Sequence, residues 1–223
     1  MRRIVPQSNR RVASAVILFA ALATTPSVAE PSSFEAGVFD ELNYFREDPA
    51  DYADELRGYR SRFDGKLLIA AEGDEIDVMT REGVAAVDEA IRVLRREAPL
   101  TTLIWSDRLQ RAAADHVAAQ SRSGAVGHYD NRGGPGDRMT ARGGGPYVNE
   151  AITYGHQTPA GVIHQLLIDD GVPGRGHRFG LLRTDQRYVG VACGAHRIHR
   201  TMCVILMSAT VDGSPPPPPR SAN

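Results

Sequence analysis

The chain has 223 residues, of which 42% are hydrophobic, and its formal net charge is −1. Such a balance argues against a nucleic-acid-binding protein, which usually carries a basic patch or stripe. The length suits one domain with an ordinary core, and no long apolar run follows the N-terminal one, so we expect no permanent membrane span beyond it.

Residues 1–29 are predicted to be a signal peptide. Four arginines precede the apolar run Val12–Ala23, and Ser27–Ala29 fits the small-residue rule for cleavage before Glu30. The alternative is an uncleaved N-terminal anchor. Cleavage removes four arginines and no acid, which changes the formal charge from −1 to −5. We therefore expect a secreted or periplasmic protein.

Helical periodicity dominates the first part of the domain. Apolar residues at helical spacing predict a helix over residues 34–59, which Pro49 ends or bends. Residues 60–80 mix glycines with acids and are interpreted as a loop. Val84–Leu94 carries a regular apolar stripe and is predicted to be a helix.

A second helical region begins at Ser106, a suitable N-cap, and places His116 on its packed face. We interpret His116 as a core histidine with a satisfied hydrogen bond rather than a site residue. Residues 133–145 are glycine-rich and are interpreted as a solvent loop with a short helical turn at 137–141. Asn149–Tyr154 is predicted to be a strand.

The C-terminal part combines a helix with a hairpin. Thr158 as N-cap and Pro159 at the first helical position begin the helix, and Gly171 is expected to end it. Residues 188–192 and 202–209 are predicted strands, separated by a turn over residues 194–200. Residues 213–223 form a proline-rich tail that we expect to be disordered.

The two cysteines, Cys193 and Cys203, lie near the closed end of this hairpin. An exported protein with an even cysteine count permits a disulfide, and two buried free thiols are the alternative. Two cysteines are too few for a thiolate zinc site. The sequence also lacks the zinc-protease helix motif, the serine nucleophile elbow, the P-loop and the dinucleotide-binding turn.

Several short segments occur in an order typical of one known family. They are Leu42–Arg46 with Pro49, Trp105–Leu109, His128 with Asp130, Asn149–Ile152, Gly176–Arg178 with Leu181, and Tyr188–Val191. Together they resemble the CAP superfamily of cysteine-rich secretory proteins, antigen 5 and pathogenesis-related proteins, in its bacterial branch. Gly174 stands where that branch usually has a serine before its histidine segment.

The resemblance implies an α+β fold, an α-β-α sandwich with a small, mainly antiparallel sheet between helices. It assigns residues 30–212 to one CAP, or SCP-like, domain, with an inserted segment at about 58–100 that carries an extra helix. It also implies a surface cleft lined by His128, His177, Glu150 and a second acid. Asp169 is the best counterpart of that acid, and Asp170 lies close behind.

Two imidazoles and a carboxylate are ligands that zinc or another divalent metal accepts, with water at an open position. His128 and His177 are therefore the candidate metal ligands, although without metal the same groups form a hydrogen-bonding cluster. His196 and His199 are interpreted as solvated turn residues. The remaining cations of interest, Arg138 and Arg178, are expected to pair with carboxylates.

Two functions fit these residues. The resemblance implies a non-enzymatic binding or interaction module, whose partner is an unknown small-molecule, lipid or protein ligand. The alternative is a metal-dependent hydrolase acting on peptides or envelope components, which the His128–Glu150–His177 set favours. The absence of a nucleophile and the doubtful second acid favour the binding module.

Overall fold

The fold is built around a small sheet in the middle of the molecule. The computed structural model describes residues 31–70 and 77–216, so the predicted signal peptide and the end of the proline-rich tail lie outside the described residues. Across the sheet the order is β4 (Ile104–Trp105), β6 (Tyr188–His196), β7 (Arg200–Ser208) and β5 (Asn149–Tyr154). β5 is therefore an edge strand. The strand pairs are antiparallel except for β4 with β6, which are parallel.

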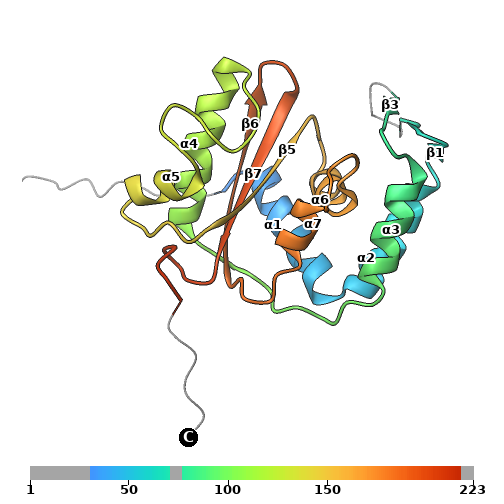
Figure 1. The fold of residues 1–223 in the computed structure, drawn as a ribbon, viewed down its shortest axis with the longest axis horizontal. Helices are drawn as coiled ribbons and strands as arrows, with labels where there is room; N and C mark the ends of the chain where they lie inside the picture. The colour runs from blue at the N-terminus through green and yellow to red at the C-terminus, as the bar shows by residue number, and fades with distance from the viewer. Residues whose placement is uncertain (1–30, 71–76, 217–223) are drawn as a thin grey trace, which may run out of the picture.

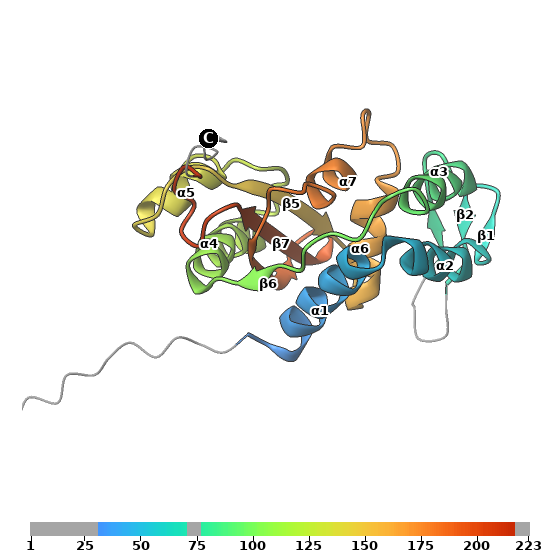
Figure 2. The same ribbon diagram turned by 90° about the horizontal axis from the view of Figure 1, so that it is seen from below.

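Helices cover both faces of this sheet (Figure 1). α4 (Asp107–Ser123) and α5 (Pro135–Ala141) lie on one face, whereas α1 (Ser33–Glu47), α6 (Pro159–Ile168) and α7 (Gly176–Leu181) lie on the other (Figure 2). Each face buries its own apolar cluster. The arrangement confirms the α-β-α sandwich. No helix within the described ranges is long and apolar enough to cross a membrane.

α4 packs unusually close to the sheet. Its buried face carries Leu109, Ala112 and Ala113, whose short side chains let the helix approach the strands. At Gly190 in β6, a Cβ atom would lie 2.0 Å from the backbone nitrogen of Gln110. Only glycine fits there, and the close contact fixes α4 over the centre of the sheet.

The segment after α1 extends the molecule sideways. α2 (Pro49–Arg60) follows a break at Asp48, as the proline predicts, and packs against α3 (Val84–Leu94). Between them the expected loop over residues 60–80 is wrong in part. The chain instead forms a three-stranded antiparallel sheet of β1 (Phe63–Asp64), β2 (Leu67–Leu68) and β3 (Val78–Met79). Strands of two residues are too short to show an alternating pattern in the sequence.

Two other expectations about element boundaries are wrong, and a third is confirmed with an earlier start. α6 ends at Ile168 rather than at Gly171, because Asp169 adopts a left-handed conformation with φ 55°. The short helical turn expected at 137–141 is α5, which ends at Ala141 as expected but begins two residues earlier, because Pro135 suits the start of a helix. The hairpin strands extend to His196 and Arg200, so only three residues remain in the turn, because cross-strand pairing continues past the cysteines.

An ion-pair network ties α3 to the loop between α6 and α7. The Arg175 guanidinium bonds to Glu82 at 2.6 Å and 2.7 Å and to Glu89 at 2.7 Å, and Arg178 bonds to Glu89 at 2.8 Å. The hydrogen bonds from Arg175 lower the pKa of Glu82 and of Glu89 from 4.5 to about 2. This contact joins two segments that lie more than eighty residues apart in the chain.

The hairpin is cross-linked. Cys193 and Cys203 lie directly opposite each other in the β6–β7 register and form a disulfide bond. The structure thus selects the disulfide over the two free thiols. Both cysteines are packed against the larger apolar cluster, so the bond joins the hairpin to the core.

We expect reduction of this disulfide to lower the free energy of unfolding. A cross-link that closes a loop of about ten residues contributes about 2–3 kcal/mol, mainly by restricting the unfolded chain. Urea unfolding of the oxidised protein and of a Cys193→Ala/Cys203→Ala variant measures the difference. A loss under about 0.5 kcal/mol would contradict this account.

The Arg175 network predicts a specific pH dependence. Because the folded-state pKa values of Glu82 and Glu89 are depressed, their stabilisation is present above about pH 4.5 and declines as the pH falls towards 2. Urea unfolding of the wild type and of Glu82→Gln/Glu89→Gln should therefore differ most at neutral pH and converge near pH 2. A difference that stays constant over this range would contradict the assignment.

Candidate functional site

A cavity of about 910 Å³ lies beside the edge strand β5, between the main sandwich and the small β1–β3 sheet. One part of its lining, called the polar end below, contains His128, His177 and Asp169, and the other polar or charged lining residues are Thr80, Arg81, His156, Gln165, Asp170 and His199. The rest is largely apolar. Its apolar lining consists of Tyr59, Phe63, Leu68, Val78, Met79, Val126, Ile152, Tyr154, Leu166, Ile168 and Val172. The loop before α5, the edge strand, the α6–α7 region and the 58–100 segment therefore all contribute to one cavity.

The first half of the polar end is His128 with Glu150. His128 Nδ1 lies 2.9 Å from Glu150 Oε1, and the second oxygen of Glu150 accepts a hydrogen bond from Arg138 Nη2. The side chains of Glu150 and Arg138 are each only 1% exposed. Arg138 also donates to the His128 carbonyl at 3.1 Å. A buried carboxylate is thus shared between a guanidinium and an imidazole, as expected for a buried charge that requires partners.

The second half is His177 with Asp169. The Asp169 carboxylate accepts from the backbone N–H of His177 at 2.9 Å and lies 2.7 Å from its Nδ1. Asp170, the alternative second acid, instead accepts from the backbone N–H groups of Arg81 and Glu82. Among the described residues it is therefore Asp169 that bonds to His177, and its left-handed backbone directs the carboxylate to the first turn of α7.

The His128–Glu150 pair and the His177–Asp169 pair lie close together. The ring centroids of His128 and His177 are 6.3 Å apart. Because each Nδ1 faces a carboxylate, each Nε2 is the nitrogen left for a ligand, which is the pattern of histidines oriented for metal binding by acids behind them. Zn–N bonds of about 2.0–2.1 Å in a tetrahedral site place two such centroids roughly 5 Å apart. The rings need to approach each other by about 1 Å to share an ion.

This donor set is smaller than the sequence suggested. Within the described part of the chain, no group of three or more His, Cys, Asp or Glu residues is arranged to hold a metal ion. Glu150 is not a third ligand, because both of its oxygens are engaged by His128 and Arg138. The two imidazoles are the candidate ligands that remain, and a divalent cation there would need water or ligand atoms to complete its coordination.

A buried network fixes the backbone beside His128. His116 is fully buried, as predicted, with Nδ1 3.0 Å from Asp130 and Nε2 2.8 Å from the Gly127 carbonyl. The same carbonyl accepts from Gln120, and the Gly127 N–H donates to the Tyr154 hydroxyl. Sequence reasoning missed Gln120 and Tyr154. Gln120 follows His116 at helical spacing, but its partners come from segments that only the fold brings near.

The other histidines and cations are also placed. His196 is wrongly interpreted as solvated: it is 2% exposed, lies 2.9 Å from the Ala125 carbonyl and accepts from the backbone N–H of His199. It holds the hairpin turn rather than a metal. His199 lines the cavity. Arg138 and Arg178 pair with Glu150 and Glu89, which confirms the expected carboxylate partners.

The fold and this site define a class: an α-β-α sandwich in which two carboxylate-bonded histidines lie beside an edge strand. A family model described as the cysteine-rich secretory protein family, CAP, matches residues 40–206. The chain belongs to the CAP family.

Solved structures offer weaker likenesses. An extracellular protein containing an SCP domain from Bacillus anthracis is 17% identical, with a TM-score of 0.41, over 56% of this chain and 37% of that one. An outer surface protein from Borrelia burgdorferi is 18% identical, with a TM-score of 0.42, over 56% of this chain and 88% of that one. No curated protein matches the chain.

We expect His116→Phe to destabilise the protein by about 2–4 kcal/mol, because it leaves a buried carboxylate oxygen of Asp130 without its partner. Asp115→Asn, one residue earlier on α4, is the matched control. Asp115 pairs with the exposed Arg142, and its loss should cost under about 1 kcal/mol. Chemical denaturation measures both values, and equal effects would contradict a special role for His116.

Proposed function

We propose that this CAP protein is secreted and acts as a non-enzymatic binding module, with the cavity beside β5 as its ligand site. The observation that carries the proposal is the pair of imidazoles at the polar end, each bonded through Nδ1 to a carboxylate. This leaves the Nε2 atom of each ring for a ligand, in two residues that line a cavity large enough for a small molecule. The residues are fixed by buried partners, so the site is formed before a ligand arrives.

A divalent cation held by His128 and His177 would supply positive charge and open coordination positions for a ligand's carboxylate, phosphate or carbonyl oxygen. Glu150 and Asp169 would orient the two rings and raise the basicity of their Nε2 atoms. In this proposal Glu150 and Asp169 contribute to cation binding by orienting the imidazoles and do not bind the cation themselves.

The apolar part of the cavity indicates the rest of the ligand. Its rim includes large apolar side chains exposed to solvent: Val78 is 47% exposed, Val126 58% and Met79 70%. Exposed apolar groups around a cavity are typical of a binding surface. We therefore propose an amphipathic small molecule, with its polar group at the imidazoles and its apolar body against β1–β3 and α6.

The hydrolase alternative has less support. Such an enzyme requires a nucleophile, or a free carboxylate that acts as a base on metal-bound water. Among the described residues that line the cavity there is neither serine nor cysteine, and the hydroxyl of Thr80 donates to the Lys66 carbonyl. Glu150 and Asp169 are both engaged by histidines, and Asp170 is engaged by backbone N–H groups. The geometry favours binding over turnover.

We expect the purified protein to bind one zinc ion, and His128→Ala or His177→Ala to abolish binding, because a single imidazole remains in each. Glu150→Gln should weaken binding about 10- to 100-fold, because it removes the acid that orients His128. Isothermal titration with zinc chloride measures these affinities.

His199→Ala is the matched control, since His199 lines the same cavity and its ring packs against Tyr154 and His196. It should bind zinc as the wild type does. Equal zinc affinity of the wild type and of the His128→Ala/His177→Ala variant would contradict a cation site at these histidines. Turnover of peptide or cell-wall substrates that disappears in this double variant would support the hydrolase instead.

A further inference from the structure

The loop between α6 and α7 carries both Asp169 and the approach to His177, and it does not hold its shape alone. Asp169 and Arg175 each adopt the left-handed region, with φ 55° and 51°. This conformation is strained for residues other than glycine and persists only where surrounding contacts enforce it. The loop's own hydrogen bonds contribute, and further contacts come from outside the loop.

Contacts from the 58–100 segment hold the start of the loop. The Asp170 carboxylate accepts from the backbone N–H groups of Arg81 and Glu82 at 2.6 Å and 2.7 Å. In return, the Gly171 N–H donates to Glu82 Oε1 at 2.7 Å. The residue directly after Asp169 is therefore bound to the residues directly before α3.

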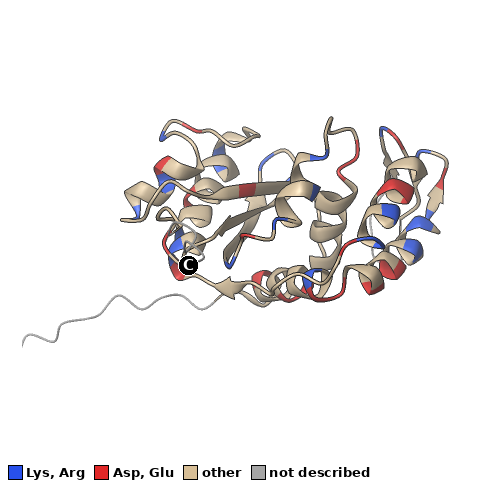
Figure 3. Ribbon diagram, turned by 60° about the horizontal axis from the view of Figure 1, so that its bottom comes forward, with Lys and Arg blue, Asp and Glu red and all other residues tan. Residues whose placement is uncertain are grey.

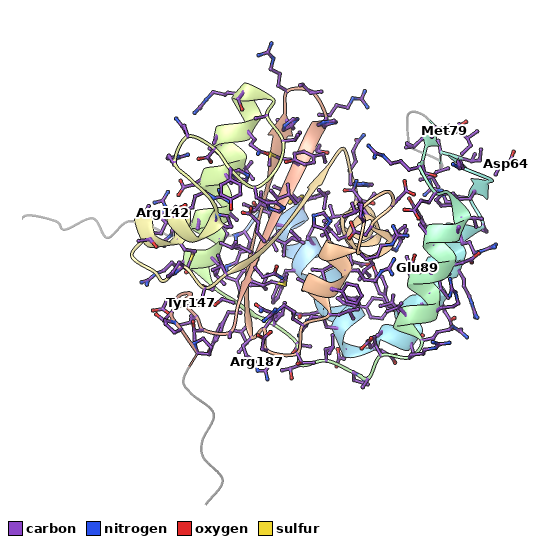
Figure 4. The ribbon with its side chains drawn as sticks, viewed as in Figure 1. Asp64, Met79, Glu89, Arg142, Tyr147 and Arg187 are labelled. Carbon is purple, nitrogen blue, oxygen red and sulfur yellow. A yellow bond between two sulfur atoms is a disulfide. The ribbon has the colours of Figure 1, made fainter. Side chains whose placement is uncertain are left out.

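Arg175 holds the end of the loop. Its guanidinium bonds to Glu82 and Glu89 and also donates to the Asp169 carbonyl at 2.8 Å. Glu89 lies on the side of α3 that faces α6 and α7 (Figure 4). A single side chain thus connects α3 to both ends of the loop, and its planar donors suit such multiple carboxylate contacts.

We propose that the 58–100 segment is a positioning element of the histidine site: Glu82 and Glu89, acting through Arg175, hold Asp169 and His177 opposite His128. The positioning of Asp169 and His177 requires no ligand, whereas the effect of that positioning on zinc binding rests on the proposed function. The depressed pKa values of Glu82 and Glu89 agree with it, because they keep both carboxylates charged at neutral pH.

The 58–100 segment also provides a matched control. Acidic and basic residues lie close together on α2 and α3 (Figure 3). Among the described residues, the carboxylate of Asp88, the neighbour of Glu89, bonds to Arg60 of α2. Asp88→Asn therefore removes a charge and an ion pair from the same helix without touching the proposed path.

The test compares Glu82→Gln/Glu89→Gln with Asp88→Asn in the full chain. Long-range proton–nitrogen spectra of the histidine rings report which nitrogen carries the proton. In the wild type and Asp88→Asn, we expect His177 to be protonated at Nδ1, facing Asp169. In the double variant this preference should be lost, whereas His128, held separately by Glu150, should keep its signals. Zinc affinity should fall at least about tenfold.

Thermal unfolding checks that each variant is folded, and the single variant Glu82→Gln replaces the double one if that one is not. Unchanged His177 signals in a folded variant would overturn the proposal, as would an equal change in Asp88→Asn. Altered His177 signals in a chain whose wild type binds no zinc would support the positioning role and contradict the proposed cation site.

Discussion

The buried carboxylate of Glu150 is the constraint on which the site depends. Its side chain is almost completely removed from water, so its charge requires partners, and Arg138 and His128 supply them. Because Glu150 lies on the edge strand β5, these partners must come to that edge. Arg138 brings α5 there, and His128 brings the preceding loop. One buried charge therefore fixes where three segments meet and which way an imidazole points.

The second histidine, His177, is also oriented by a carboxylate, but different groups hold that carboxylate in place. Asp169 accepts from His177 much as Glu150 accepts from His128, but the surrounding contacts differ. The first half is held by groups buried inside the sandwich, including His116 and Gln120. The second is held from outside, by charged side chains of the 58–100 segment. The His128 half is thus held by buried groups and the His177 half by the 58–100 segment. Both halves line one cavity, and the 58–100 segment also contributes apolar residues to its lining.

Much of the fold follows from local sequence pattern. The predicted helix Val84–Leu94 and strand Asn149–Tyr154 match α3 and β5 residue for residue. In α3 the reason is an apolar stripe that repeats along the whole helix and carries strong local information. The strands β1–β3 could not be predicted, since two residues hold no periodicity and their pairing depends on α2 and α3.

The site, like the fold, could be predicted from the sequence only in part. The resemblance to the CAP family pointed to His128, Glu150, Asp169 and His177, but it did not supply the bonds between them. That Asp169 rather than Asp170 faces His177 depends on one left-handed backbone conformation, which α6 and Arg175 together impose. The buried state of His196 depends on the Ala125 carbonyl, seventy-one positions earlier in the chain. Contacts of this range are consequences of the fold and leave no local pattern.

The central claim is that two acids turn the Nε2 atoms of two histidines towards one point. A crystal structure of the protein soaked in zinc tests it most directly. The account predicts one zinc peak bonded to Nε2 of His128 and of His177, with Glu150 and Asp169 still on the Nδ1 atoms. Density bonded through Nδ1, or rings pointing to separate places with no shared ion, would contradict it.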